Sequence, residues 1–232
     1  CGTDTASNLI QFIAAPAISE VIAPTNCFGD STGEVAINVI GGVSPYTYSW
    51  TNGTTTAVNS NLTAGVYGVT ASGENGCVAS DSLVVTEPTA IQLQLDSADD
   101  VLCNGFSNAR AFVTTSGGTA PYTFLWSNGE LVEDALSLPA GTNNLTVIDA
   151  NNCSSSLSIQ ISELQPVVVS STISGSSCFG AADGQVSINA IGGLSGYNYN
   201  WSNGDSLSHI TDLISGEYSL LTTDSVGCFS ID

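Results

Sequence analysis

The sequence contains almost no positive charge. Its 232 residues include 21 aspartates and glutamates but one arginine, Arg110, one histidine, His209, and no lysine, so the net charge is -20. Nucleic-acid binding needs a basic surface that contacts phosphate groups, and anionic membranes attract basic segments. The composition therefore excludes nucleic acid as a partner and argues against direct membrane binding or insertion. It predicts an acidic surface that keeps the chain soluble and attracts divalent cations diffusely.

The sequence also lacks motifs of other protein classes. No Cys-x-x-Cys pair is present, which removes the short ligand spacing typical of zinc sites. No apolar run reaches about 18 residues, so no membrane-spanning helix is expected, and neither a methionine nor a signal peptide is found. Evenly spaced cysteines in small β-rich units are typical of disulfides made in an oxidising compartment. We therefore expect an extracellular protein whose secretion signal lies outside this sequence.

Three cysteine, tryptophan, cysteine frames divide the chain. In each frame a tryptophan follows the opening cysteine by 23 residues, and a closing cysteine follows the tryptophan by 27. Prolines end the last strand of each unit, so we predict repeat 1 at 16–87, repeat 2 at 88–165 and repeat 3 at 166–232, with 1–15 as the C-terminal strand of a truncated preceding repeat that ends its own frame with Cys1. The frames are Cys27, Trp50 and Cys77; Cys103, Trp126 and Cys153; and Cys178, Trp201 and Cys228.

Each repeat alternates polar with apolar residues at the spacing of β-strands. In repeat 1, Val35, Ile37 and Val39 share one face of a strand, and an aromatic strand follows. A pair of glycines ends the first of these strands, and an Asn-Gly pair, a strong hairpin signal, ends the second. About seven short strands and no helical periodicity predict an all-β, immunoglobulin-like sandwich for each repeat. The nearly constant length of the junctions predicts that the tandem sandwiches form a rod.

Aromatic residues at alternate positions supply the predicted core anchors, because such rings lie on one face of a strand. In repeats 1 and 3 a tyrosine, Tyr67 or Tyr218, follows Gly65 or Gly216 by two residues and is predicted to fix a corner between the sheets. Repeat 2 has Asn143 there, so its corner is expected to be less firmly held. The predicted anchors are Tyr46, Trp50, Tyr122, Trp126, Tyr197 and Trp201.

The constant spacing favours a disulfide inside each repeat, where it closes a loop of about 50 residues. The favoured pairs are Cys27 with Cys77, Cys103 with Cys153, and Cys178 with Cys228. In an ordinary sandwich these loops lie at opposite ends, about 25 Å apart, so the pairing needs the opening cysteine on an extra strand beside the last one. The alternative pairs Cys27 with Cys153 and Cys103 with Cys228, and leaves Cys1, Cys77 and Cys178 to bond with other units.

No catalytic site or cofactor is expected. His209 has Asp205 and Asp212 near it in the sequence, but no Ser/His/Asp set recurs, and Arg110 is interpreted as a solvated or locally paired strand residue. Acidic extracellular sandwiches often bind calcium through loop carboxylates. Asp30 and Asp183 follow opening cysteines at different offsets, so no shared calcium site is predicted, although a site in one repeat stays open.

One combined motif is specific. The stretch CFGDSTGEVAINVIGGVSPYTYSWTNG, followed by LTAGVYGVTASGENGCVASDSLVVTEP, resembles the SprB-type repeat of the giant surface adhesins of gliding Bacteroidetes, which is itself similar to PKD-type immunoglobulin-like domains. The resemblance covers essentially the whole chain: the three repeats and the tail of one more. It implies export through the type IX pathway, display on the cell surface, and a role in adhesion, gliding or biofilm formation.

Short triplets of aspartate, serine or threonine, and an apolar residue recur through the chain. They are similar to the O-glycosylation motif of secreted Bacteroidetes proteins, so we predict O-glycans, although strand alternation beside turns also favours these residues. The predicted acceptors are Thr5, Ser82, Ser97, Ser206 and Ser225.

The function predicted from the sequence is mechanical and adhesive. The chain is expected to be a non-catalytic repeat segment of a secreted surface adhesin, with its neighbouring repeats and a polysaccharide, host or substrate surface as partners. One alternative is a glycan-binding module, for which Phe28, Phe106 and Phe179 near the opening cysteines are the available loop aromatics. Another is a filament subunit whose edge strands pair with those of like chains.

Overall fold

The structure is a computed structural model that describes residues 13–232. The predicted strand at 1–15 lies almost wholly outside the described residues. Within the described part the chain forms eighteen β-strands and no helix, which confirms the all-β prediction. The residues group into two compact units: one runs up to Gln92 and includes Ser116–Tyr122 and Ile148–Ser154, and the other holds Leu93–Thr115, Thr123–Val147 and Ser155–Asp232.

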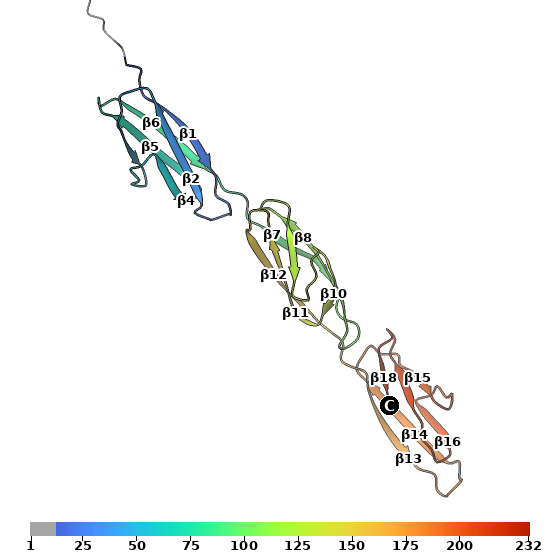
Figure 1. The fold of residues 1–232 in the computed structure, drawn as a ribbon. Coiled ribbons are helices and arrows are strands. Elements are labelled where there is room, and N and C mark those ends of the chain that lie inside the picture. Colours follow the sequence, from blue (N-terminus) through green and yellow to red (C-terminus); the bar gives the residue numbers. More distant parts are fainter. Residues whose placement is uncertain (1–12) are drawn as a thin grey trace, which may run out of the picture. The chain divides into compact units, whose positions relative to one another are not determined.

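Each repeat contributes two three-stranded sheets (Figure 1). Each repeat has six strands, where about seven are predicted from the sequence, because the loop of the opening cysteine forms no strand. The sheet orders are β1-β2-β4 and β3-β5-β6 in repeat 1, β10-β8-β7 and β12-β11-β9 in repeat 2, and β13-β14-β16 and β15-β17-β18 in repeat 3.

The strand bounds follow the alternation in the sequence. In repeat 1 they are β1 (Ala17–Ala23), β2 (Gly33–Ile40), β3 (Tyr46–Trp50), β4 (Val58–Leu62), β5 (Gly65–Gly73) and β6 (Val78–Val85). In repeat 2 they are β7 (Gln92–Ala98), β8 (Ser107–Ser116), β9 (Thr123–Trp126), β10 (Ala135–Pro139), β11 (Gly141–Ile148) and β12 (Ser154–Ile161). In repeat 3 they are β13 (Val168–Ser174), β14 (Gly184–Ile191), β15 (Asn198–Trp201), β16 (His209–Leu213), β17 (Leu220–Thr223) and β18 (Phe229–Ile231).

The tryptophans lie at the centre of the sandwiches. Trp50, Trp126 and Trp201 are 3%, 1% and 6% exposed. Each indole Nε1–H donates to the backbone carbonyl six residues later, over 2.9, 3.0 and 3.0 Å. A buried tryptophan needs such a partner for its only polar atom, so this bond fixes the chain that leaves the aromatic strand.

The Asn-Gly pairs do not form the predicted hairpins. After β3 the chain crosses to the other sheet, because β3 pairs with β5 whereas β4 pairs with β2. Only the glycine has a positive φ, 90° at Gly53, so the turn is not type I′. The asparagine instead acts through its side chain, since Asn128 Oδ1 accepts from the Glu130 amide (3.1 Å) and Asn203 Oδ1 from the Asp205 amide (3.0 Å).

The paired glycines close the end of each sandwich. Gly117 and Gly118 have φ of 73° and 61°, and a Cβ on Gly117 would lie 2.0 Å from the Ala90 carbonyl oxygen. The half-buried Tyr122 donates its hydroxyl hydrogen bond to the Gly117 carbonyl. Tyr46 and Tyr197 make the same bond to Gly41 and Gly192. The predicted tyrosine anchors are therefore half-buried rings that hold this turn.

The corner of repeat 2 is held as firmly as the others. Tyr67 donates to the Thr63 carbonyl (3.0 Å) and Tyr218 to the Ile214 carbonyl (3.2 Å), each four residues earlier. Asn143 is 1% exposed, and its Nδ2 donates to the equivalent carbonyl, that of Pro139 (2.9 Å). The prediction of a loose corner is wrong, because the shorter amide reaches the same acceptor from inside the core.

Candidate functional site: the disulfide-linked loops

Two disulfides join different repeats. Cys27 is bonded to Cys153, with the Cα atoms 5.6 Å apart, and Cys103 to Cys228, with the Cα atoms 5.3 Å apart. Each pair lies inside one compact unit. The favoured prediction of bridges within repeats is therefore wrong, and the alternative pairing is the one observed. Cys77 and Cys178 are exposed free thiols, and Cys1 lies outside the described residues.

The distance between the two ends of a sandwich explains the disulfide pairing. In repeat 1 the closing turn before Cys77 lies beside Val43, because the Glu74 amide donates to the Val43 carbonyl (2.9 Å). The opening loop lies at the other end of β6, where the Thr25 amide donates to the Thr86 carbonyl (3.0 Å). The eight residues of β6 separate the two ends by about 25 Å. A disulfide needs Cα atoms about 4.4–6.8 Å apart, so Cys27 cannot reach Cys77.

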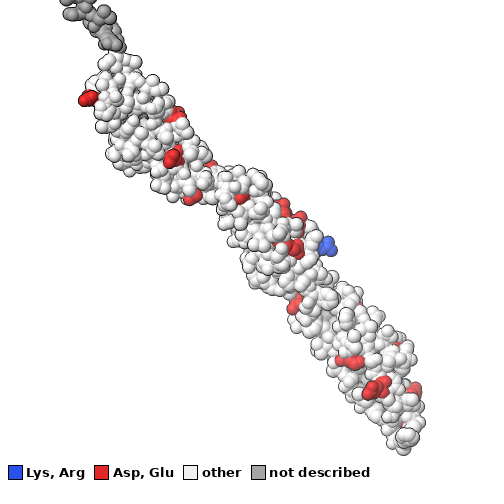
Figure 2. Space-filling view, viewed as in Figure 1, with Lys and Arg blue, Asp and Glu red and all other residues white. Residues whose placement is uncertain are grey.

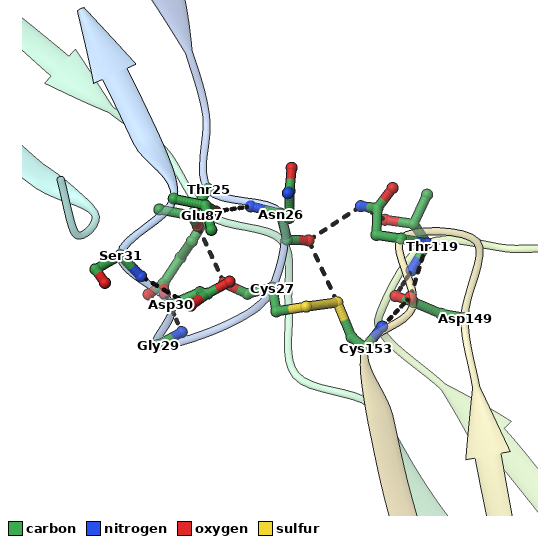
Figure 3. The surroundings of a disulfide bond; sticks show 12 residues. Thr25, Asn26, Cys27, Gly29, Asp30, Ser31, Glu87, Thr119, Asp149 and Cys153 are labelled. Atoms are coloured by element: carbon green, nitrogen blue, oxygen red, sulfur yellow. Dashed lines mark hydrogen bonds between the residues drawn. A yellow bond between two sulfur atoms is a disulfide. The ribbon is translucent and has the colours of Figure 1, made fainter. Parts of the chain in front are cut away.

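A glutamate holds each bonded opening loop. The Glu87 carboxylate accepts from the Gly29 amide over 2.6 Å (Figure 3). In the same way, the Glu163 carboxylate accepts from the Gly105 amide over 2.9 Å. Both glutamates come two residues after the end of the last strand of the repeat. The loop is therefore tied to its own repeat by a charge-assisted hydrogen bond while its cysteine bonds to the next repeat.

An aspartate shapes each bonded closing turn. The carboxylate of Asp149, four residues before Cys153, accepts from the amides of Thr119, Asn151 and Cys153 over 2.9 Å each. Asp224 does the same in repeat 3, for the amides of Leu194, Val226 and Cys228. Burial raises the pKa of Asp149, but the three amide donors outweigh burial and hold this pKa below its ordinary value of 3.8. The carboxylate is ionised at neutral pH and fixes the cysteine that comes after it.

Asn26 brings the two bonded loops together in the first junction. The Asn151 Nδ2 donates to the Asn26 carbonyl oxygen (3.0 Å), and the Cys153 Sγ lies 3.4 Å from the same oxygen (Figure 3). In the second junction the Cys228 Sγ lies 3.1 Å from the Leu102 carbonyl oxygen. The residue before each bonded opening cysteine therefore faces the closing cysteine of the next repeat.

The two disulfides enclose overlapping segments. The first spans 126 residues and the second 125, and residues 103–153 belong to both loops. A covalent path through both sulfur bridges connects the two ends of the chain with about 80 residues of backbone, because it bypasses 27–103 and 153–228. A pulling force on the two ends therefore acts on this short path even if the sandwiches unfold.

The predicted glycan acceptors lie on the surface. Ser82, Ser97, Ser206 and Ser225 are all exposed, and Thr5 lies outside the described residues. Acidic side chains lie at several places on the face shown in Figure 2, and some of them lie near the one basic side chain. Arg110 is exposed and lies 3.8 Å from Asp99.

The residues considered as catalytic or calcium-binding form hydrogen bonds with nearby residues. The His209 Nδ1 lies 2.7 Å from the Ser187 hydroxyl on the neighbouring strand, whereas Asp205 accepts from the Ser206 and Leu207 amides. Asp183 accepts from the Ser177 amide (2.9 Å), and its hydrogen bonds with Ser177 lower the pKa of Asp183. Over residues 13–232 no three His, Cys, Asp or Glu side chains are grouped so that they could hold a metal ion. The same part of the chain has no helix able to cross a membrane.

The chain was compared with solved structures. It is similar to the three N-terminal domains of the bacteriophage RB49 Highly Immunogenic Outer Capsid protein (14% identity, TM-score 0.43, 94% of this chain and 96% of that one). It is also similar to immunoglobulin domains 1–5 of Sidekick-1 (11%, 0.34, 95% and 58%) and to the N-terminal eight immunoglobulin domains of Down Syndrome Cell Adhesion Molecule (13%, 0.37, 89% and 33%). At these identities and TM-scores, the similarities add nothing to what the sheets themselves show about the fold.

No curated protein sequence matches the chain. The SprB repeat family matches it three times, at residues 19–55, 95–131 and 170–206. Each match begins in the first strand of a repeat, contains the opening cysteine and the tryptophan, and ends just after the Asn-Gly pair. The chain is therefore a tandem array that belongs to the SprB repeat family.

Proposed function

We propose that the chain is a force-bearing repeat segment of a secreted cell-surface adhesin and has no catalytic role. The family match supports this proposal, because SprB repeats occur in surface-associated proteins. The resemblance further implies export by the type IX pathway and a part in gliding or biofilm formation. In this role the repeats hold an adhesive tip away from the cell.

The observation that carries the proposal is the overlap of the two disulfides. A disulfide within a repeat would protect only that repeat, whereas Cys27–Cys153 and Cys103–Cys228 each bind one repeat to the next. Closing a loop of about 125 residues also lowers the entropy of the unfolded chain, by an amount worth about 5 kcal/mol for each bridge. Repeats of about 75 residues bury a limited core, so this constraint is a large part of their stability.

Single-molecule stretching of the 232-residue chain tests the proposal. With both disulfides intact, the fully stretched chain should have the length of only about 80 residues, roughly 280 Å at ~3.5 Å per residue. After reduction the same chain should reach about 800 Å. An oxidised chain that extends as far as the reduced one would contradict a force-bearing role for the bridges.

A second candidate function is glycan binding, favoured by one repeated feature. Phe28, Phe106 and Phe179 lie near the opening cysteines and are 59%, 53% and 109% exposed. An exposed aromatic face can pack against the C–H face of a sugar ring. A glycan array probed with the whole chain, and with the triple Phe→Ala variant as its control, tests this function. Equal signals from the two proteins would count against it.

A further inference from the structure

Repeat 1 has one edge strand without the usual protection. Natural proteins protect sheet edges against pairing with other chains by means of charged side chains or β-bulges. The edge strands of repeat 1 are β1, β3, β4 and β6. β1 carries Glu20 and β6 carries Asp81, and these two strands contact each other. β4 has a register shift at Asn61, whose φ is 58°. The edge of β3 has none of these features.

The strand β3 directs unpaired backbone groups outward. It pairs with β5 over five consecutive residues without a shift, and the Thr51 amide just after it donates to the Gly68 carbonyl (2.9 Å). Because the backbone groups of successive residues point to opposite sides of a strand, those of Ser49 face β5 and those of Tyr48 face outward. In the described part of the chain nothing bonds to the Tyr48 amide or carbonyl. The Tyr48 side chain packs against the core, which holds this edge in place.

The turn after this strand distinguishes repeat 1 from the other two repeats. In each repeat the amide of the core tryptophan donates to the carbonyl four residues later, which belongs to Thr54, Glu130 or Asp205. Repeats 2 and 3 therefore place an acidic residue beside this edge, whereas repeat 1 places a threonine. The whole stretch 35–73, which contains β3, β4 and β5, has no charged side chain, although the chain has 21 acidic residues.

The absence of charge selects the partner. An acidic partner is repelled by the net charge of -20, and a basic partner finds no carboxylate on this stretch. Two copies of the chain also repel each other, but at the uncharged edge they approach without burying a charge. Two identical edges satisfy each other's hydrogen bonds when they pair antiparallel about a two-fold axis. A second copy of repeat 1 therefore matches the edge in both charge and hydrogen bonding.

We propose that two copies of the chain pair through β3 of repeat 1, antiparallel and centred on Tyr48. The Tyr48 amide of each copy donates to the Tyr48 carbonyl of the other. The two three-stranded sheets then form one sheet in the order β6-β5-β3-β3-β5-β6. This interaction goes beyond the proposed function. A two-fold pair is closed, so each edge binds one partner.

The centre on Tyr48 determines which side chains meet. Thr47 of each copy lies opposite Ser49 of the other, and both side chains are exposed on the outer face of the sheet. These two residues exchange no hydrogen bonds with each other in this register, so their Cα atoms come within about 4.5 Å. Charges introduced at both positions therefore act directly across the interface.

The test uses the full chain with Cys1→Ser, Cys77→Ser and Cys178→Ser, so that no free thiol links two copies. Sedimentation velocity of this parent at up to about 1 mM should show a dimer. Thr47→Asp with Ser49→Asp places like charges opposite each other, as does Thr47→Lys with Ser49→Lys. Each double variant should raise the dissociation constant at least about tenfold. An equal mixture of the two should dimerise at least about tenfold more tightly than either alone.

The matched control adds two charges to the outer face of the same sheet at β6. Ser80 and Ser82 are exposed there, and Ser80→Asp with Ser82→Asp should leave the dimer of the parent unchanged. Urea unfolding checks that every variant unfolds as cooperatively as the parent. A parent that stays monomeric would overturn the proposal, and so would equal weakening by the substitutions on β3 and β6.

The mixture gives a third decisive outcome. If the Asp and Lys variants both fold but do not associate when mixed, the pairing of Thr47 with Ser49 is wrong and the proposal falls. Because the readout is association between copies, its failure leaves the stretching result within one copy unaffected.

Discussion

Glu87 and Gly29 are 58 residues apart in the sequence and are joined by a carboxylate-to-amide hydrogen bond of 2.6 Å. Glu163 and Gly105 repeat the bond at the same separation over 2.9 Å. Each bond connects the end of the last strand to the loop of the opening cysteine. The position of the cysteine that bonds to the next repeat is therefore set by a residue of its own repeat.

We expect Glu87→Ala to free the Gly29 amide. A hydrogen bond to a charged group on the surface contributes about 1–1.5 kcal/mol, so hydrogen exchange at Gly29 should become about tenfold faster. Amide exchange measured by NMR checks this, with Glu20→Ala on β1 as the control. An unchanged exchange rate at Gly29 would show that the loop holds its shape without the carboxylate.

We expect Gly117→Ala to destabilise the protein strongly, because its Cβ would lie 2.0 Å from the Ala90 carbonyl oxygen. The matched control is Gly129→Ala, which has a φ of 93° but nothing within 4 Å of the added atom. The control should cost about 1 kcal/mol for its backbone conformation, and Gly117→Ala at least about 3 kcal/mol. Urea unfolding measures both, and equal losses would argue against the close approach.

Asn143→Ala should cost about 1–3 kcal/mol, because it removes the buried side-chain amide that donates to the Pro139 carbonyl. The neighbouring Asn144 is exposed, so Asn144→Ala should change the free energy of unfolding by less than about 0.5 kcal/mol. Thermal or urea unfolding of the two variants makes the comparison. Similar stabilities would mean that the corner does not depend on this amide.

The Asp224 carboxylate should make stability depend on pH. Burial raises the pKa of Asp224, but the amides of Leu194, Cys228, Val226 and Gly227 outweigh burial and lower it below 3.8. A folded-state pKa below the unfolded value adds stability that is complete above about pH 4 and is lost as the pH falls through the folded value.

Asp224→Asn removes this titration. The variant should be less stable than the parent at pH 7, and the difference should shrink toward about pH 2, as the falling pH protonates the parent carboxylate. Urea midpoints at the two pH values measure the change, with Asp30→Asn as the control. A difference that stays constant with pH would exclude the ionised carboxylate as its cause.

Strands and core could be predicted from the sequence because they depend on a period of two and on large apolar side chains. Val35, Ile37 and Trp50 are buried as their alternation indicates. The Asn-Gly hairpins could not be predicted correctly, since the turn signal is local whereas the sheet that receives the next strand is chosen by packing over the whole repeat. The same distinction explains Asn143, whose acceptor depends on how deeply the corner is buried.

Spacing alone could not decide the disulfide pairing, because a strict repeat makes both pairings equally regular. Cys27 is 50 residues from Cys77 and 126 from Cys153, and both separations recur with little change. Two signals in the sequence mark the bonded loops. A glutamate that holds the opening loop comes ten residues after a closing cysteine, at Glu87 and Glu163. An aspartate that shapes the closing turn comes four residues before a closing cysteine, at Asp149 and Asp224. The length of one strand excludes a disulfide within a repeat, because it separates the opening and closing loops of a single repeat.

The disulfides between repeats can be tested directly with trypsin, because Arg110 is the only basic cleavage site in the chain. In the Cys103→Ser variant, Cys27–Cys153 should be the remaining bond across that site. After free thiols are alkylated and the protein is denatured and digested, a non-reducing gel should show one species near 23.6 kDa, which separates into 1–110 and 111–232 only on reduction. Two fragments without reductant would mean that each bond lies within its own repeat, and would contradict the linkage.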